Sequence, residues 1–166
     1  QMDPLELEHV LQPILEGGAD YVKGNRLFYG RVWEVMPKVR FFGNAVLSLM
    51  TKAASGYWHI ADSQTGYTAL SKQMLDRLPL EKIYPGYGYP NHMLYLLNLG
   101  NAVVADVPVR PIYNVGEVSG LRIPKVAPRI SWLLFKCFWK RLFNKFVLQD
   151  FHPLIFFYLL ALVLLL

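Results

Sequence analysis

The sequence has 166 residues, of which 54% are hydrophobic, so the chain is too apolar for an intrinsically disordered protein and fits one domain. Its single cysteine, Cys137, excludes a disulfide framework and any zinc site built from several cysteines. The net charge is unevenly spread, since residues 1–121 carry 10 Lys and Arg against 11 Asp and Glu, whereas residues 122–166 carry 7 against one. The basic character therefore belongs to the C-terminal part.

The first 121 residues predict an alternation of helices and strands. Residues 5–16 have the apolar spacing of a helix and are followed by two glycines, after which residues 20–23 are typical of a strand. Further helices are predicted at 39–55 and 71–78. Small and β-branched residues at 102–109 predict another strand. The fold class expected from this order is α/β.

Three short segments have the composition of functional loops. Lys23-Gly24-Asn25-Arg26 follows the first predicted strand and offers a glycine and two cations, which suit a phosphate group. The polar run 62–67 lies between apolar segments, and residues 84–92 form an aromatic loop rich in Gly and Pro. Each segment alone also fits an ordinary role, namely a turn with a surface cation, a capped helix start and a rigid packed loop.

The stretch from 129 to 147 predicts a basic amphipathic helix. Its large apolar residues recur at spacings of three and four, with the cations largely between them, which favours a position along an anionic membrane surface. Nucleic acid is the competing partner for such a helix, but the helix leads directly into an apolar run. The residues concerned are Trp132, Phe135, Trp139, Leu142, Phe143 and Phe146, with the cations Lys136, Lys140, Arg141 and Lys145.

The C-terminal end of the sequence is apolar. Residues 153–166 contain 14 residues without a charge, whereas a membrane-spanning helix needs about 20. We expect this run to be the start of a transmembrane helix, the alternative being a buried C-terminal helix. The sequence opens with Gln1 and closes within this run, so we also expect it to be part of a longer chain.

The order of the short motifs resembles a known enzyme family. Gln1-Met2-Asp3-Pro4, Val22-Lys23-Gly24-Asn25-Arg26, Asp62-Ser63-Gln64-Thr65-Gly66-Tyr67, Val107-Pro108-Val109 and Gly116-Glu117-Val118-Ser119 precede the basic helix and the apolar run. This order resembles the C-terminal half of membrane-anchored family-2 glycosyltransferases, and most closely the polyprenyl-phosphate enzymes such as dolichyl-phosphate mannose or glucose synthases. The resemblance implies the C-terminal half of a glycosyltransferase A-type fold in residues 1–121, a juxtamembrane segment in 122–150 and the start of a transmembrane helix in 151–166.

The resemblance also implies roles for particular residues. Gln1 resembles the third protein ligand of a divalent metal, Mg²⁺ or Mn²⁺, with two aspartates expected just before it. Arg26 resembles the cation that contacts phosphate, and Asp62 the catalytic acidic residue beside the acceptor. Thr68 stands where the family often has Arg or Lys, and the cation of the family's last motif is displaced to Arg122. The other candidates for substrate or phosphate binding are Lys23, Gln64, Thr65, Ser119 and Arg122.

The activity implied is transfer of a sugar from a nucleotide-sugar to a polyprenyl phosphate, with the catalytic part on the cytoplasmic side of a membrane. A lipid phosphate is already anionic near neutral pH, so Asp62 would orient the acceptor or a nearby cation. An acceptor hydroxyl would instead require Asp62 as a general base, and the sequence leaves both roles open. The expected partners are the donor, the lipid acceptor and membrane lipids, with no nucleic acid.

The 166 residues by themselves are expected to be inactive, because the paired aspartates of the metal motif would lie outside them. The alternative function is therefore a non-catalytic module that binds membranes or other proteins.

Overall fold

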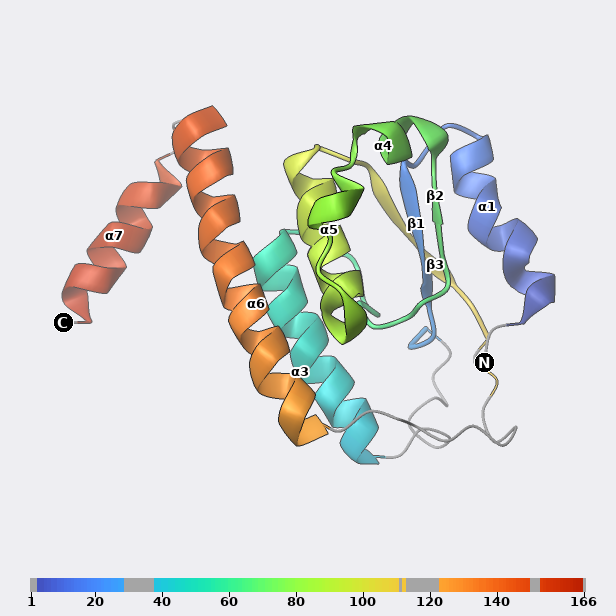
Figure 1. The fold of residues 1–166 in the computed structure, drawn as a ribbon, viewed down its shortest axis with the longest axis horizontal. Coiled ribbons are helices and arrows are strands. Elements are labelled where there is room, and N and C mark those ends of the chain that lie inside the picture. The colour runs from blue at the N-terminus through green and yellow to red at the C-terminus, as the bar shows by residue number, and fades with distance from the viewer. Residues whose placement is uncertain (1–2, 29–37, 111, 113–122, 150–152, 166) are drawn as a thin grey trace.

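The computed structural model describes residues 3–28, 38–110, 112, 123–149 and 153–165. These residues form a three-stranded sheet between two layers of helices (Figure 1). Helix α1 (Leu7–Leu15) packs on one face of the sheet, whereas α3 (Lys38–Ser55), α5 (Tyr89–Leu99) and α6 (Ile123–Phe143) form the layer on the other side. The described part is therefore a mixed α/β structure, which confirms the predicted fold class at this level.

The sheet has the order β2–β1–β3, formed by Thr68–Leu70, Tyr21–Asn25 and Val104–Pro108. β1 is antiparallel to β2 and parallel to β3, so the carboxyl ends of β1 and β3 lie at the same edge. Because side chains alternate along a strand, Tyr21 packs into the larger core with α5 and α6, and Val22 packs against α1. Lys23 and Asp106, which are paired in the register, lie two residues after Tyr21 and Val104. Their side chains therefore lie on the same face of the sheet as those of Tyr21 and Val104.

Helix α1 begins two residues after and ends one residue before the bounds that the sequence predicts. A short 3₁₀ helix, Pro4–Glu6, leads into it, and the Asp3 carboxylate accepts a hydrogen bond from the backbone N–H of Leu5 at 3.0 Å. Gly17 has a φ of 73°, a left-handed conformation that glycine adopts without strain. Its N–H and that of Gly18 bond to carbonyls in the last turn of α1, which ends the helix.

Two elements were not predicted. Residues 84–92 were expected to be a loop, but α5 begins at Tyr89, directly after the short 3₁₀ helix Gly86–Gly88. That prediction is wrong from residue 89 onward, because Pro90 lies in the first turn, where a missing N–H costs nothing, and Gly100 follows the last turn. The second element that was not predicted, β2, is only three residues long.

The predicted helix at 71–78 is present as α4 (Lys72–Arg77), followed by the 3₁₀ helix Leu80–Lys82.

Helix α6 has two apolar faces, whereas the sequence predicted one. Ile130, Leu133, Leu134 and Cys137 are buried in the core shared with α5 and the sheet, and α6 also packs along α3. Four of the five predicted aromatic residues lie elsewhere on the helix, and their exposed fractions are 60% for Trp132, 51% for Phe135, 44% for Trp139 and 56% for Phe143. The helix thus docks through its aliphatic residues and leaves these four aromatic residues exposed, whereas Phe138 packs partly against the core. Leu142, predicted to lie with the exposed aromatic residues, is 3% exposed, so its assignment to the membrane-facing side is wrong.

Two of the four predicted interfacial cations bind the protein instead of facing outward. The Arg141 guanidinium donates to the backbone oxygens of Ala53 and Ala54 at 3.0 Å each, at the C-terminal end of α3. A cation there compensates the carbonyls that the helix itself leaves unpaired. The Lys145 ammonium lies 3.1 Å from the Asn101 side-chain oxygen. Of the four, Lys136 and Lys140 are exposed.

The chain continues from α6 through a short π-helix, Asn144–Gln149, to α7 (Leu154–Leu164). α7 lies beside α6 in Figure 1, and the rings of Phe138 and Tyr158 meet edge to face at 6.1 Å between centroids. Among the helices of the described ranges, none is long and apolar enough to cross a membrane. The expected transmembrane start in residues 151–166 therefore stays a prediction.

Candidate functional site

The candidate site lies at the carboxyl ends of β1 and β3. In open α/β sheets, ligands bind beyond the carboxyl ends of parallel strands. Here the chain between α3 and β2 passes over this edge on the side of α3 and α5, and it carries the polar run 62–67. This arrangement brings together five predicted site residues from two segments, namely Lys23, Arg26, Asp62, Gln64 and Thr65.

Arg26 and Asp62 form a two-point ion pair across this edge. The Arg26 Nε atom lies 2.7 Å from Asp62 Oδ2, and Nη2 lies 3.1 Å from Oδ1. The Asp62 side chain is 1% exposed and that of Arg26 18%. Asp62 Oδ1 also accepts from the backbone N–H of Gln64 at 3.1 Å. Planar, two-point pairing of this kind fixes the orientation of both groups.

Lys23 is a buried cation that contacts the loop 62–67. Its ammonium donates to the backbone oxygen of Thr65 at 2.8 Å, and the residue is 0% exposed. Burial lowers the pKa of Lys23 to about 8, although the nearby Asp62 and Asp106 favour the charged form. In the structure Lys23 therefore binds the loop 62–67 directly, and its predicted contact with phosphate stays a prediction.

A glycine permits the close contact between β1 and the end of this loop. The backbone N–H of Gly24 donates to the oxygen of Tyr67 at 2.8 Å. A Cβ atom at Gly24 would lie 3.1 Å from that oxygen and 2.9 Å from a methyl group of Val109. The sequence Lys23-Gly24-Asn25-Arg26 thus combines a strand end, a close backbone approach and two cations at one edge.

A buried polar network connects the loop 62–67 to α3 and α5. Asn91 of α5 is 0% exposed, and its side-chain oxygen accepts from Gln64 Nε2 at 2.7 Å and from Thr51 Oγ1 at 3.0 Å. Ser63 and Ser48 of α3 are joined at 3.0 Å between their hydroxyl oxygens. The side-chain nitrogen of Asn91 has no partner among the described residues. Gln64 therefore connects the loop to α5 through a side-chain contact.

Asp106 is a site residue that the sequence reasoning missed. Its Oδ2 atom accepts from Asn25 Nδ2 at 2.8 Å and from the backbone N–H of Ala61 at 3.2 Å. Its Oδ1 atom is buried without a partner in the described ranges. Burial is the main cause that raises the pKa of Asp106, and the charge of Asp62 adds to it. A lone acidic residue within the apolar strand 102–109 was the signal that could have identified it.

Three predicted site residues, Gln1, Ser119 and Arg122, lie outside the described residues. Within the described residues, no group of three or more His, Cys, Asp or Glu side chains is placed to hold a metal ion. Both oxygens of Asp62 are engaged by Arg26 and Gln64, and Asp106 Oδ1 is a single acceptor near the Lys23 cation. The described part of the site therefore does not form a metal-binding set by itself.

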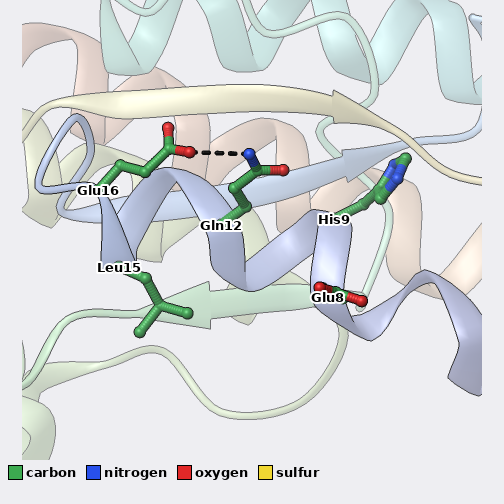
Figure 2. Close-up of a pocket in the computed structure, with 5 residues that line it drawn as sticks. All are labelled: Glu8, His9, Gln12, Leu15 and Glu16. Atoms are coloured by element: carbon green, nitrogen blue, oxygen red, sulfur yellow. Dashed lines mark hydrogen bonds between the residues drawn. The ribbon is translucent and has the colours of Figure 1, made fainter.

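A separate pocket lies along α1, on the other face of the sheet (Figure 2). It is lined by residues of this single helix, and Gln12 donates to the Glu16 carboxylate at 2.7 Å within it. None of its lining residues belongs to the predicted site. The lining residues are Glu8, His9, Gln12, Leu15 and Glu16.

Comparison with known proteins finds two curated relatives of the chain. The chain is 30% identical over 114 residues to the UDP-N-acetylglucosamine--dolichyl-phosphate N-acetylglucosaminyltransferase of Methanococcus voltae, covering 69% of this chain and 45% of that protein. It is 27% identical over 143 residues to an uncharacterized protein of Methanocaldococcus jannaschii, covering 86% of this chain and 57% of that protein. The chain thus spans about half the length of these curated relatives. No protein-family model and no solved structure matches it significantly. The similarity supports a relationship to glycosyltransferases in general.

Proposed function

We propose that this chain forms the acceptor side of a family-2 glycosyltransferase that transfers a sugar from a nucleotide-sugar to a polyprenyl phosphate. The partly buried ion pair between Arg26 and Asp62 carries the proposal, because it joins two motifs that lie 36 residues apart in the sequence. The relative from Methanococcus voltae, whose name specifies a dolichyl-phosphate acceptor, supports this assignment. The full activity, with its donor and acceptor, is proposed for the complete protein.

The geometry favours an orienting role for Asp62 over a general-base role. A general base must be free to accept a proton from the acceptor, whereas both Asp62 oxygens already accept hydrogen bonds from Arg26 and Gln64. A phosphate acceptor needs little proton removal, because its second pKa is about 6. Asp62 therefore holds the Arg26 guanidinium in place, and the guanidinium stabilises the phosphate charge.

A divalent cation, Mg²⁺ or Mn²⁺, belongs to the same proposal. When bound, it would stabilise the charge that develops on the leaving diphosphate. Gln1 is the residue of this chain assigned to it. The described residues act on the acceptor side, where Lys23 and Arg26 supply positive charge and Asp62 and Asp106 balance it.

The membrane position is proposed from α6. Its exposed aromatic residues line up, with Trp132 and Phe135 stacked at 5.5 Å and Phe135 and Trp139 edge to face at 6.2 Å between centroids. Lys136 lies over the Trp132 ring at 5.9 Å. Exposed tryptophans and lysines suit the headgroup region of an anionic leaflet, which we place on the cytoplasmic side. The same surface supports the second candidate function, a membrane-binding module without catalysis.

The test is transfer of a labelled sugar to a polyprenyl phosphate by the complete protein. Asp62→Asn keeps the shape of the side chain and removes the charge that orients Arg26, so we expect kcat to fall by roughly 10- to 100-fold with little change in the KM of the donor. Arg26→Lys keeps a cation but loses the two-point contact, and we expect it to raise the KM of the lipid phosphate. Asp76→Asn and Arg77→Ala, at two exposed positions on α4, are matched controls and should leave both constants unchanged.

Wild-type kinetics in Asp62→Asn would show that Asp62 has no role in the transfer reaction. Absence of transfer by the wild type with every nucleotide-sugar tested, combined with tight vesicle binding, would favour the membrane-binding module.

A further inference from the structure

We propose that Asp106 is a positioning residue that fixes the two backbone segments carrying Arg26 and Asp62. One oxygen atom makes both contacts, since Asp106 Oδ2 accepts from Asn25 Nδ2 at 2.8 Å and from the Ala61 N–H at 3.2 Å. Asn25 directly precedes Arg26, and Ala61 directly precedes Asp62. The members of the ion pair are therefore held through their immediate neighbours in the chain.

On the Arg26 side, the Asn25 side chain contacts both Asp106 and the residue after Arg26. Asn25 is buried, and while its side-chain nitrogen donates to Asp106, its side-chain oxygen accepts from the backbone N–H of Leu27 at 2.9 Å. The carboxamide therefore bridges from β3 to the residue after Arg26. The turn that presents the guanidinium is fixed on both sides of Arg26, and Asp106 is the anchor of that bridge.

The contact on the Asp62 side fixes the entry to the loop. The Ala61 N–H donates to Asp106, and the ring of His59, two residues earlier, lies 2.8 Å from the backbone oxygen of Val104, also on β3. β3 therefore holds the chain at two points just before Asp62. A shift of about 1 Å in a group that contacts substrate can reduce turnover by roughly 100-fold, so this restraint bears on catalysis.

The contact and the charge of Asp106 can be separated by substitution. Its second oxygen is buried without a described partner, which costs stability, and an asparagine could accept both hydrogen bonds through its single side-chain oxygen. Lys23, its partner in the strand register, lies close enough to interact with its charge, as do Asp62 and His59. Asp106→Asn therefore keeps an oxygen for the two-point contact and removes the charge, so it distinguishes the two contributions.

The experiment separates the two-point contact from the charge, and its catalytic part rests on the proposed function. Asp106→Ala removes both hydrogen bonds, whereas Asp106→Asn retains the accepting oxygen. Asp20→Ala is the matched control, because Asp20 Oδ2 also accepts a backbone N–H of the neighbouring segment, that of Val103 at 2.8 Å, but at the opposite end of β1. The complete ¹⁵N-arginine-labelled protein is examined for the Arg26 Nε–H signal, identified by its loss in Arg26→Lys, and is assayed for sugar transfer.

We expect the Arg26 Nε–H signal to be lost or exchange-broadened in Asp106→Ala and retained in Asp106→Asn and Asp20→Ala. We expect kcat to fall roughly 10- to 100-fold in Asp106→Ala with a smaller change in KM, and by no more than about threefold in Asp106→Asn. Retention of the signal in Asp106→Ala, or equal loss in Asp20→Ala, would overturn the proposal. Equal loss of turnover in the Asn and Ala variants would also overturn it, because the charge and not the contact would then matter. If the wild type transfers no sugar, the proposed function fails while the Arg26 signal still tests Asp106.

Discussion

Lys23 and Arg26 are close in the sequence, but burial gives them different properties. Lys23 is 0% exposed and donates to a backbone oxygen, whereas Arg26 is part of a two-point ion pair with a carboxylate. A buried ammonium with a neutral partner loses much of its hydration, so its charged form is disfavoured. The stability of the fold should therefore depend on the protonation of Lys23.

This dependence has a definite sign. The pKa of Lys23 is lowered from 10.5 to about 8 in the folded protein, so between pH 8 and 10.5 the unfolded state binds the proton that the folded state has lost. Stability therefore rises with pH across this window. The change corresponds to about 3 kcal/mol at 1.36 kcal/mol per pH unit.

The prediction is measured as the difference in free energy of unfolding between the wild type and Lys23→Met. This difference should move in favour of the wild type by about 3 kcal/mol from pH 8 to 10.5, because the methionine variant cannot titrate at this position. Urea unfolding at half-unit pH intervals gives the two curves. A difference that stays constant from pH 7 to 11 would show that Lys23 is not desolvated.

The sequence offered candidate residues for the site, but it could not give their contacts. The order of short motifs singled out Arg26 and Asp62, and the structure brings the two together. Which cation pairs with Asp62 depends on the path of a loop 36 residues away, and local patterns do not contain that information. Asp106 was missed because its importance comes from two hydrogen bonds to distant segments, and no motif surrounds it.

At the scale of elements, helix α6 shows how one sequence pattern can hide another. The aromatic residues recur at helical spacing and predicted an apolar stripe, but Ile130, Leu133, Leu134 and Cys137 recur at the same spacing on another side. The aliphatic side packs in the core, and this side positions α6 against α3 and α5. Periodicity indicates that a helix is amphipathic, but it does not say which apolar side contacts protein.

Neighbouring residues of α6 give a matched test of this assignment. Leu134 is 2% exposed and Phe135 is 51% exposed. Leu134→Ala should lower the free energy of unfolding by about 2–5 kcal/mol, because it leaves a cavity in the core. Phe135→Ala should change it by no more than about 0.5 kcal/mol. Urea unfolding followed by far-UV circular dichroism measures both, and equal losses would contradict the assignment of the two faces.

The elements that were missed are those whose stability depends on tertiary contacts. β2 has three residues and exists through its pairing with β1. Helix α5 begins within a segment rich in Gly, Pro and Tyr, which is typical of a loop, yet most of the helix is buried. By contrast, α1 was predicted to within two residues at its start and one residue at its end, and local glycines set that end.

At the scale of the whole molecule, the sheet separates two differently constructed sides. One face is covered by α1, whereas the other is covered by α3, α5 and α6, with α7 beyond (Figure 1). The candidate site lies at one edge of the sheet on the side of α3 and α5, and the exposed aromatic residues of α6 belong to the same helical layer. The proposed membrane contact through α6 and the proposed acceptor binding at Asp62 involve different residues, so they can be tested separately.

The last prediction concerns the electrostatic part of membrane binding. Lys136 and Lys140 are exposed on α6, and a lysine near an anionic leaflet contributes about 1 kcal/mol, so the double variant Lys136→Gln/Lys140→Gln should bind anionic vesicles roughly 30-fold more weakly. The measurement is vesicle sedimentation with protein that stops at Asp150, since the apolar α7 could otherwise hold the chain on the vesicle. Added salt should weaken wild-type binding, because it screens exposed charges. Lys72→Gln/Lys82→Gln, which removes two exposed lysines elsewhere, should bind like the wild type. Equal binding of all three proteins to neutral and anionic vesicles, without salt dependence, would show that the aromatic residues alone hold α6 at the membrane.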